Sequence, residues 1–582
     1  MKGLSEMGSR HWLIVSALAC IVAFVSLSLY RNRHEIWFAN PDQDSAIVLN
    51  ALYVNADGIT NYWDHPSHGS YYVYAGMYRI MEKLHLLDMS NLGQLGASKN
   101  PLLPLSEVYY KSRWISILIC ILCALAFGGI FYGATRKWTW GAAALGLYLI
   151  ASGGLFFQSL VIRSELVSLW FSLVAFAGII LASRAQDWVR SSLWVGLAGL
   201  FFGMAMLTKV QVAPIGLCLL AYLLYACVRT APSLKPRAYS PAVVAGQILL
   251  YLILWAFFSE LRDLCHRIPT DVKETTQFQI PWLVYAAFAI AMLGEILSFS
   301  AASCSWRLPF FITRLKPFVT GYILSLYVSF FALNFETYGL EASRLCKART
   351  ILKLFNPYGS SMQADFSIAI GPSEVLKEFG KHLYHYFLVS GHLSLVVALA
   401  AAVVILARRP PSLAAFFSTA CGLLLCLVCS LRYFHLYYLC YCDVFFIAAI
   451  LCLLYQLRST EWVRFGGIGR SGIFKWGTVV LAIALAVSAF RQYSFVSTKY
   501  SRLWWKDQVD KIPAGVCAPS NYQVYMQRAY GSPDAIMRRV CSDPDLNGSK
   551  YGIDLRMKPA AQQYLKYFDD AAATSPTLTP EQ

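Results

Sequence analysis

The sequence predicts an all-α polytopic membrane protein, a bundle of about 13 transmembrane helices with large extracytoplasmic loops. Two features of its composition predict this fold class: 57% of the 582 residues are hydrophobic and only 14% are charged, and the mean hydropathy is +0.50. A soluble chain of this length does not bury so much apolar surface, so lipid must surround most of it. The third observation is that apolar runs of about 20 residues, the length that crosses about 30 Å of hydrocarbon, recur along the chain.

The first of these runs extends from Trp12 to Tyr30 and follows Lys2 and Arg10. It does not end in a small-residue cleavage site, so we expect a retained helix rather than a signal peptide. The N-terminus is then predicted to be cytoplasmic. The polar stretch 31–113 follows as the first extracytoplasmic loop.

Twelve further apolar runs follow this loop and complete a predicted membrane domain over residues 1–490. They lie near 114–134, 139–159, 165–183, 192–207, 210–228, 240–258, 281–301, 317–335, 385–407, 412–430, 434–455 and 475–490. An odd number of spans places the tail, 491–582, outside the cell. A second large extracytoplasmic loop is predicted at 336–385.

Basic residues in alternate connectors support this orientation, because Lys and Arg accumulate in cytoplasmic loops. The basic connectors are Arg136-Lys137, Arg184–Arg190, Arg229–Arg237, Arg307–Lys316 and Arg408-Arg409. They account for much of the net charge of +17, so no nucleic-acid partner is expected. We interpret the chain as a multi-pass protein of the bacterial inner membrane.

The first loop holds the densest group of ionisable residues, with four carboxylates and two histidines within 27 positions. Pro41 precedes Asp42 and Asp44, and periodic apolar residues follow, which predicts a helix with one of these acids near its cap. A carboxylate at the membrane surface can accept the proton of an attacking hydroxyl. Asp42 and Asp44 are therefore the candidate catalytic residues, although a single loop acid more commonly caps a helix.

The same two acids are a candidate site for a divalent cation, because hard oxygen ligands suit Mg²⁺ or Mn²⁺. The histidines of the loop, His65 and His68, are three positions apart. Pro66 and Gly69 indicate a turn there rather than a helix face. A zinc site is therefore not expected.

The order of features in this loop resembles the GT-C superfamily of membrane glycosyltransferases, which includes protein O-mannosyltransferases and the lipid A aminoarabinose transferase. Members carry an acidic pair soon after the first helix and a His-Pro element further on. The matching residues here are Asp42-Gln43-Asp44 and Asp64-His65-Pro66, followed by Tyr71-Tyr72-Val73-Tyr74. Because Gln43 replaces the second acid of the usual pair, the resemblance leaves open whether Asp42 or Asp44 is the base.

Three later segments extend the resemblance to about the first 230 residues and to the region around Arg432. Arg163-Ser164-Glu165 opens the predicted fourth helix, and the stretch from Gly203 to Lys209 is similar to a Gly-x-x-x-Leu-Thr-Lys element. The stretch from Leu431 to Tyr438 is similar to an Arg-Tyr element before a late helix. Each segment is a weak match alone, and their shared order carries the resemblance.

The basic residues of these segments fit an anionic lipid-linked donor, because Arg and Lys at the hydrocarbon boundary are costly unless they snorkel or meet negative charge. A polyprenyl phosphate supplies that charge. Arg432 would hold the phosphate bidentately and Lys209 would act as a point charge. For Arg163, a structural pair with Glu165 or an interfacial anchor explains the residue equally well. For the aromatic belt around Arg432, simple interfacial anchoring is the alternative.

The resemblance implies an inverting transferase that moves a sugar from a polyprenyl-phosphate donor to a glycan, lipid or protein acceptor on the periplasmic face. The expected substrate-binding residues are Asp64, His65, His68, Arg163, Glu165, Lys209, Arg432, Tyr433 and His435. A flippase or transporter for a lipid-linked saccharide is the first alternative, and it requires ionisable residues within the helices. The second is an O-antigen-ligase-type transferase, for which the 336–385 loop would be decisive.

Overall fold

The computed structural model describes residues 2–34, 43–57, 68–91, 93–94, 102–230, 244–256, 288–294, 296, 315–325, 372–431, 436–459, 483–484 and 486–497. Within these ranges the chain is helical apart from short connections, and they contain no strand. Six helices in the described part are long and apolar enough to cross a membrane, or seven if one bent pair forms a single span. The all-α membrane fold is thus confirmed, whereas a total of 13 spans stays a prediction. The tail beyond residue 497 and the 336–371 part of the second loop lie outside the described residues.

The first loop contains two helices of its own between the first two spans. Helix α1 (Lys2–His34) is followed by α2 (Gln43–Asp57), α3 (His68–Lys83) and then α5 (Leu102–Thr135). Helix α5 begins at Leu102, so the last 12 residues of the stretch 31–113 are already helical. Its apolar window starts at Glu107, and the helix therefore extends past the hydrocarbon.

The span predicted near 139–159 is broken. Helix α6 (Trp138–Ala151) ends before Ser152, and the short α7 (Gly153–Gln158) begins after it. Ser152 has an extended backbone, and its side chain accepts a hydrogen bond from Leu155 N–H, as a helix N-cap does.

Helices α8 (Ser164–Ala182) and α9 (Trp188–Thr208) then form an antiparallel hairpin. The turn η1 (Val210–Val212) and α10 (Ala213–Thr230) follow it. The start of α8 and the end of α9 consequently lie at the same end of the bundle.

The second half also contains a bent pair of helices, which includes the apolar run predicted near 385–407. Helix α16 (Pro372–Tyr384) and the π-helical turn η5 (His385–Val389) meet α17 (His392–Ala407) at 67°. Gly391, at φ 71°, lies in the bend, and glycine adopts this left-handed conformation without steric cost. Helix α18 (Leu413–Ser430), the turn η6 (Leu436–Tyr438) and α19 (Leu439–Ser459) complete the described bundle.

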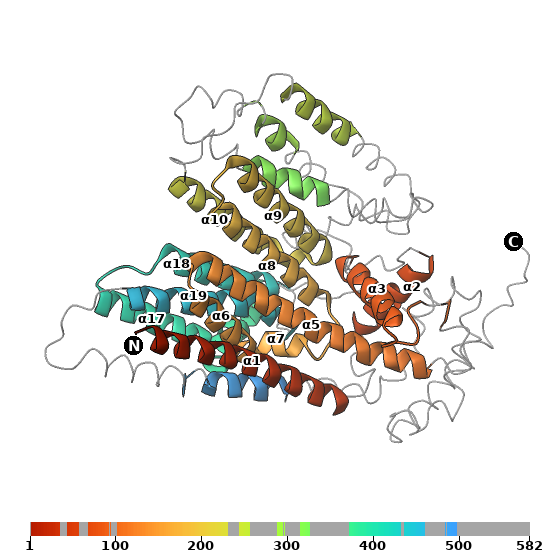
Figure 1. Cartoon of the computed structure of the whole chain (residues 1–582), viewed down its shortest axis with the longest axis horizontal. Coiled ribbons are helices and arrows are strands. Elements are labelled where there is room, and N and C mark those ends of the chain that lie inside the picture. The colour runs from red at the N-terminus through yellow and green to blue at the C-terminus, as the bar shows by residue number, and fades with distance from the viewer. Residues whose placement is uncertain are drawn as a thin grey trace, which may run out of the picture.

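The candidate span that contains α19, Leu436–Arg458, is the most buried one, with 89% of its most apolar stretch inside the protein. It packs against α18, α17, α7 and α6. Helix α1 is the least buried at 11%, and its exposed Ile14, Val15, Leu18 and Val22 form a face suited to lipid. In Figure 1, α2 and α3 lie together beside one end of the bundle, near the ends of α5, α8 and α9.

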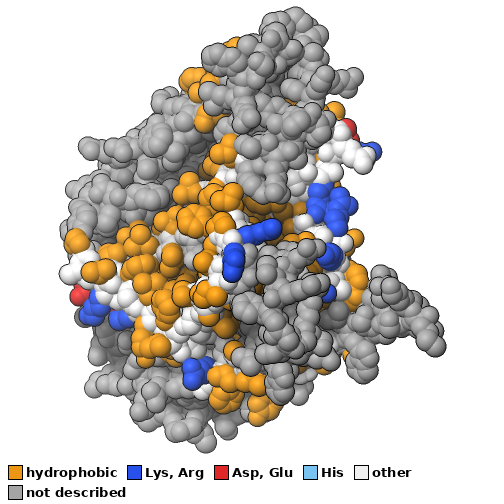
Figure 2. All heavy atoms as spheres, turned by 90° about the vertical axis from the view of Figure 1, so that its left-hand side faces the viewer, with side chains coloured by type: hydrophobic (Ala, Val, Ile, Leu, Met, Phe, Trp, Pro, Cys, Tyr) orange, Lys and Arg blue, Asp and Glu red, His pale blue; other side chains and the backbone are white. Residues whose placement is uncertain are grey.

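The opposite end of the bundle carries basic side chains. In Figure 1 the N-terminal end of α1 lies there, and Figure 2, which looks onto this end, shows Lys and Arg groups among hydrophobic side chains with few acids. The connectors after α5, α8 and α17 contain Arg136, Arg184 and Arg408. This distribution is typical of a cytoplasmic face, and the extracytoplasmic placement of α2 and α3 stays a prediction.

Candidate functional site

Three residues singled out in the sequence form one ionic cluster. Lys209 Nζ lies 3.0 Å from Glu165 Oε1, and Arg163 Nε lies 3.4 Å from Glu165 Oε2. The α8–α9 hairpin explains the meeting, since Arg163 directly precedes α8 and Lys209 directly follows α9. The structural pair of Arg163 with Glu165, left open by the sequence, is present.

The cluster is almost completely removed from solvent. The exposed fraction is 2% for Arg163, 1% for Lys209 and 0% for Glu165. Taking such charges out of water costs several kcal/mol for each ion, on the order of what well-placed partners return. One carboxylate therefore holds two cations in a region of low dielectric, where an additional anion would interact strongly with them.

Tyr437 covers the guanidinium group. Arg163 Cζ lies 3.5 Å from the centroid of the Tyr437 ring, within the range of a cation–π contact. Tyr437 belongs to η6, and its carbonyl accepts a hydrogen bond of 2.8 Å from Gln158 Nε2. Arg432, Tyr433 and His435 lie outside the described residues, but the chain that follows them directly reaches the cluster.

The first loop also reaches this site, through Asp44. Asp44 lies in the first turn of α2, which confirms the helix start predicted there. Its side chain is fully buried, and Asp44 Oδ1 accepts a 3.0 Å hydrogen bond from Ile162 N–H, 118 residues away in the sequence. Ile162 directly precedes Arg163, so the carboxylate is bonded to the segment that carries the cluster.

The other side of the same peptide unit is held by α5 and α3. Ser116 Oγ donates to the Val161 carbonyl at 2.9 Å, and the Tyr74 hydroxyl lies 2.8 Å from Ser116 Oγ. Burial raises the pKa of Tyr74 well above its ordinary value, so the phenol stays neutral. The peptide between Val161 and Ile162 is thus fixed from both sides.

Helix α3 approaches the cluster at Gly69, which the sequence placed in a turn. That prediction is wrong, because Gly69 lies in the first turn of α3. A Cβ at this position would meet the Thr208 hydroxyl and the Phe171 ring. Helix α3 therefore touches the end of α9 next to Lys209. His68 begins α3, whereas Asp64 and His65 lie outside the described residues.

Replacing Gly69 with alanine should destabilise the protein by about 1–3 kcal/mol, the usual cost of overpacking. Thr208 can move only by giving up the 2.7 Å hydrogen bond that its hydroxyl donates to the Met204 carbonyl. The control is Gly76→Ala on the same helix, where a Cβ meets nothing within 4 Å. Thermal unfolding in detergent checks the pair, and equal midpoints for the two variants would contradict the close contact.

Of the two acids predicted to bind a divalent cation, Asp44 is described and Asp42 lies outside the described residues. Among the residues that the structure describes, there is no group of three or more His, Cys, Asp and Glu side chains able to hold a metal ion. The divalent cation predicted at Asp42 and Asp44 stays a prediction.

A second buried polar group was not predicted from the sequence. Asp443 and His392, both fully buried, face each other with Asp443 Oδ1 and His392 Nδ1 3.6 Å apart. Asp443 lies inside the 434–455 run, where apolar neighbours conceal it in a hydropathy average. The sequence could have singled out Asp443 as an ionisable residue inside an apolar run, since such residues in membrane spans usually have a function.

Comparison of the chain with protein-family models, with curated proteins and with solved structures found no match.

Proposed function

We propose that the chain is a membrane glycosyltransferase that moves a sugar from a polyprenyl-phosphate donor to an extracytoplasmic acceptor, with the inversion that the GT-C resemblance implies. The observation that supports this most is the meeting of three separate motifs at one end of the bundle. Asp44 from the acidic element contacts the segment that carries Arg163 and Glu165, and Lys209 joins that cluster. In a bacterium this end would face the periplasm.

The donor phosphate is proposed to bind at the two cations. Lys209 and Arg163 both contact the carboxylate of Glu165, and the phosphate would add a further negative charge beside them. During transfer the acceptor oxygen bonds to the anomeric carbon, and the bond from that carbon to the phosphate oxygen breaks. The phosphate leaves with the electron pair, and preorganised donors stabilise its charge by roughly 3 kcal/mol each. Arg432, with Tyr433 and His435, is proposed to contact the same headgroup.

The base is proposed to be Asp42, with Asp44 as the residue that holds the Arg163 segment. A general base must be within reach of the acceptor hydroxyl. Asp44 is fully buried, and one of its oxygens already accepts Ile162 N–H. Asp64, His65 and His68 are proposed to line the sugar or acceptor pocket.

Substitution of the two acids tests this assignment. Asp42→Asn should lower transfer by about 10²- to 10⁴-fold, the usual contribution of a general base. Asp44→Asn keeps an oxygen that accepts Ile162 N–H, so about a tenfold loss is expected, equivalent to one weakened hydrogen bond. The measurement is transfer from a radiolabelled polyprenyl-phosphate-sugar pool in membranes at matched expression. A larger loss of transfer in Asp44→Asn than in Asp42→Asn would identify Asp44 as the base. Full activity of both variants and of the double variant would contradict the proposal.

A carrier for a lipid-linked saccharide is the second candidate, and Asp443 favours it. A carrier requires ionisable residues along a path through the membrane, and Asp443 and His392 lie within or beside candidate spans. Reconstituted liposomes separate the two functions. A carrier moves a labelled lipid-linked saccharide between leaflets without forming a new glycosidic bond, whereas the transferase forms that bond.

The ligase-type alternative concerns the 336–385 loop, whose 336–371 part lies outside the described residues. Loss of activity on changing Arg344 or Lys347, with Asp42→Asn fully active, would favour it over the mechanism above.

A further inference from the structure

Helix α7 and its N-cap Ser152 lie antiparallel to η6 and the start of α19. At one end Ser152 Oγ donates to Asp443 Oδ2 at 2.7 Å, and at the other Gln158 Nε2 donates to the Tyr437 carbonyl at 2.8 Å. The step from Ser152 to Gln158 is six residues forward, and the step from Asp443 to Tyr437 is six residues back. The two contacts therefore belong to one alignment of α7 on α19.

Gly154 allows the close approach between these two segments. A Cβ at Gly154 would collide with backbone atoms of Leu439 and Cys440. These atoms have no rotamer by which to move away, so any larger residue must push α7 off α19. Glycine at this position is consequently required by this alignment.

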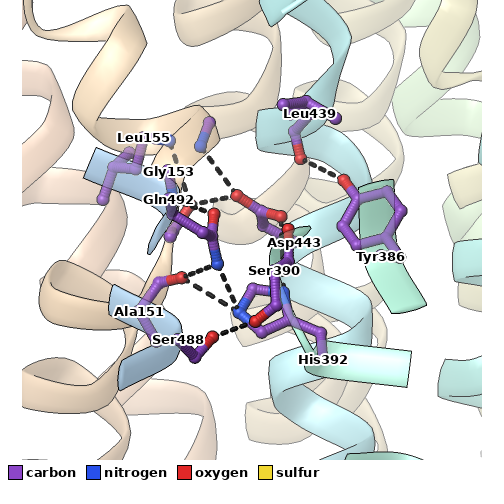
Figure 3. A network of polar contacts seen from close by, with 12 residues as sticks. Ala151, Gly153, Leu155, Tyr386, Ser390, His392, Leu439, Asp443, Ser488 and Gln492 are labelled. Atoms are coloured by element: carbon purple, nitrogen blue, oxygen red, sulfur yellow. Dashed lines mark hydrogen bonds and ion pairs between the residues drawn. The ribbon is translucent and has the colours of Figure 1, made fainter. Parts of the chain in front are cut away.

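Asp443 and Gln492 satisfy the backbone groups that the break between α6 and α7 leaves open. Asp443 Oδ2 accepts Gly154 N–H at 2.8 Å, Gln492 Oε1 accepts Gly153 N–H at 2.7 Å, and Gln492 Nε2 donates to the Ala151 carbonyl at 2.6 Å. Figure 3 shows these side chains converging on the break. Buried helix ends need such partners, and the break is therefore built by residues distant in sequence.

His392 completes the network from α17. Its Nε2 lies 3.0 Å from the Ala151 carbonyl and 2.8 Å from Gln492 Nε2. The Gln492 oxygen is engaged by Gly153 N–H, so the amide NH₂ faces His392 Nε2. Which of its two contacts Nε2 donates to and which it accepts from depends on whether the ring proton is on Nε2 or on Nδ1. His392 Nδ1 faces Asp443 Oδ1 at 3.6 Å.

The far end of α7 leads directly into the ionic cluster. Ser159 Oγ contacts Ser28 Oγ of α1 at 2.8 Å, and Asn32 Nδ2 donates to the Ser159 carbonyl at 3.1 Å. Three residues later Ile162 N–H reaches Asp44, and Arg163 follows. The position of Arg163 thus depends on where α7 is held.

We propose that Asp443 is a positioning residue of the transferase, which together with Gly154 fixes α7 on α19 and thereby sets Arg163 against Glu165 and Tyr437. The catalytic consequence rests on the proposed function, whereas the dependence of the 159–163 segment on Asp443 does not. Asp443 acts here as a hydrogen-bond acceptor. Its charge and any transfer of its proton are not required.

Three variants of the full-length chain test the proposal by kinetics. Asp443→Ala and Gly154→Ala should each raise the donor KM about tenfold or more, a change equal to about 1.4 kcal/mol, and leave the acceptor KM unchanged. Asp443→Asn should stay within about threefold of wild type, since one amide oxygen can accept from both Ser152 and Gly154 at about 1 kcal/mol per bond. Gly76→Ala on α3 is the matched control for a glycine substitution.

Amide hydrogen exchange of the protein in nanodiscs provides a second readout that needs no activity. Exchange at residues 159–163 should accelerate in Asp443→Ala and Gly154→Ala, and match wild type in Asp443→Asn.

An Asp443→Ala variant with the kinetics and the exchange of the wild type would overturn the proposal. So would an Asp443→Asn variant as impaired as Asp443→Ala, because the carboxylate charge would then be the required property, as in a proton relay or carrier. If the wild type transfers no sugar at all, the proposed function fails, and the exchange result still decides the positioning. Should Gly154→Ala fail to fold, the two Asp443 variants decide alone.

Discussion

Replacing Lys209 with methionine should lower sugar transfer by about 10²- to 10³-fold, the usual effect of removing one donor from a site of developing negative charge. Methionine keeps much of the apolar stem of lysine and removes the ammonium group that lies 3.0 Å from Glu165. Glu165 retains Arg163 as its partner, so the loss should appear in turnover and donor binding more than in folding. Transfer from a radiolabelled donor in membranes at matched expression measures it.

The matched control is Arg190→Ala at the other end of α9. Arg190 is 81% exposed and pairs with Asp187 at 3.3 Å, a surface contact worth about 1 kcal/mol or less. Its removal should leave transfer unchanged. Full activity of Lys209→Met would show that the buried ammonium has no part in the reaction.

Replacing Glu165 with leucine should be the most destabilising single change in the site. The substitution removes the carboxylate that both Arg163 and Lys209 contact, and both cations are almost fully buried. Breaking a buried ion pair by removing one partner costs about 3–5 kcal/mol. The midpoint of thermal unfolding in detergent should fall accordingly.

Two further variants are controls for the loss of stability in Glu165→Leu. Glu374→Ala breaks an exposed pair with Lys377 at 3.6 Å and should leave the midpoint nearly unchanged. The double variant Glu165→Leu with Lys209→Met buries one cation fewer and should recover part of the lost stability. A Glu165→Leu protein as stable as wild type would contradict the shared-carboxylate description.

Hydropathy alone predicted most described spans closely. The runs predicted at 165–183 and 412–430 correspond to α8 (Ser164–Ala182) and α18 (Leu413–Ser430). Such runs are predictable because the length of a span is set by the thickness of the bilayer. The breaks at Ser152 and Gly391 were not predicted, since apolar runs flank the short stretches Ser152-Gly153-Gly154 and Ser390-Gly391-His392 on both sides. The break at Ser152 depends on Asp443 and Gln492, which are hundreds of residues away.

The site was predictable residue by residue but not as an arrangement. Motif order identified Arg163, Glu165 and Lys209, and sequence proximity suggested the pair of Arg163 with Glu165. That Lys209 shares the same carboxylate follows from the α8–α9 hairpin, and the contact of Asp44 with Ile162 follows from the docking of α2 beside it. Asp443 was not predicted because one acid hardly lowers the mean hydropathy of the otherwise apolar run 434–455.

The most direct test of the central claim is transfer by the purified chain in liposomes that contain a radiolabelled polyprenyl-phosphate-sugar pool and an envelope extract as the source of acceptor. The account predicts that wild type moves label from the lipid-phosphate fraction to the acceptor fraction, and that Asp42→Asn and Lys209→Met do not. Label that stays on the polyprenyl phosphate with wild type, or that moves equally with both variants, would contradict it.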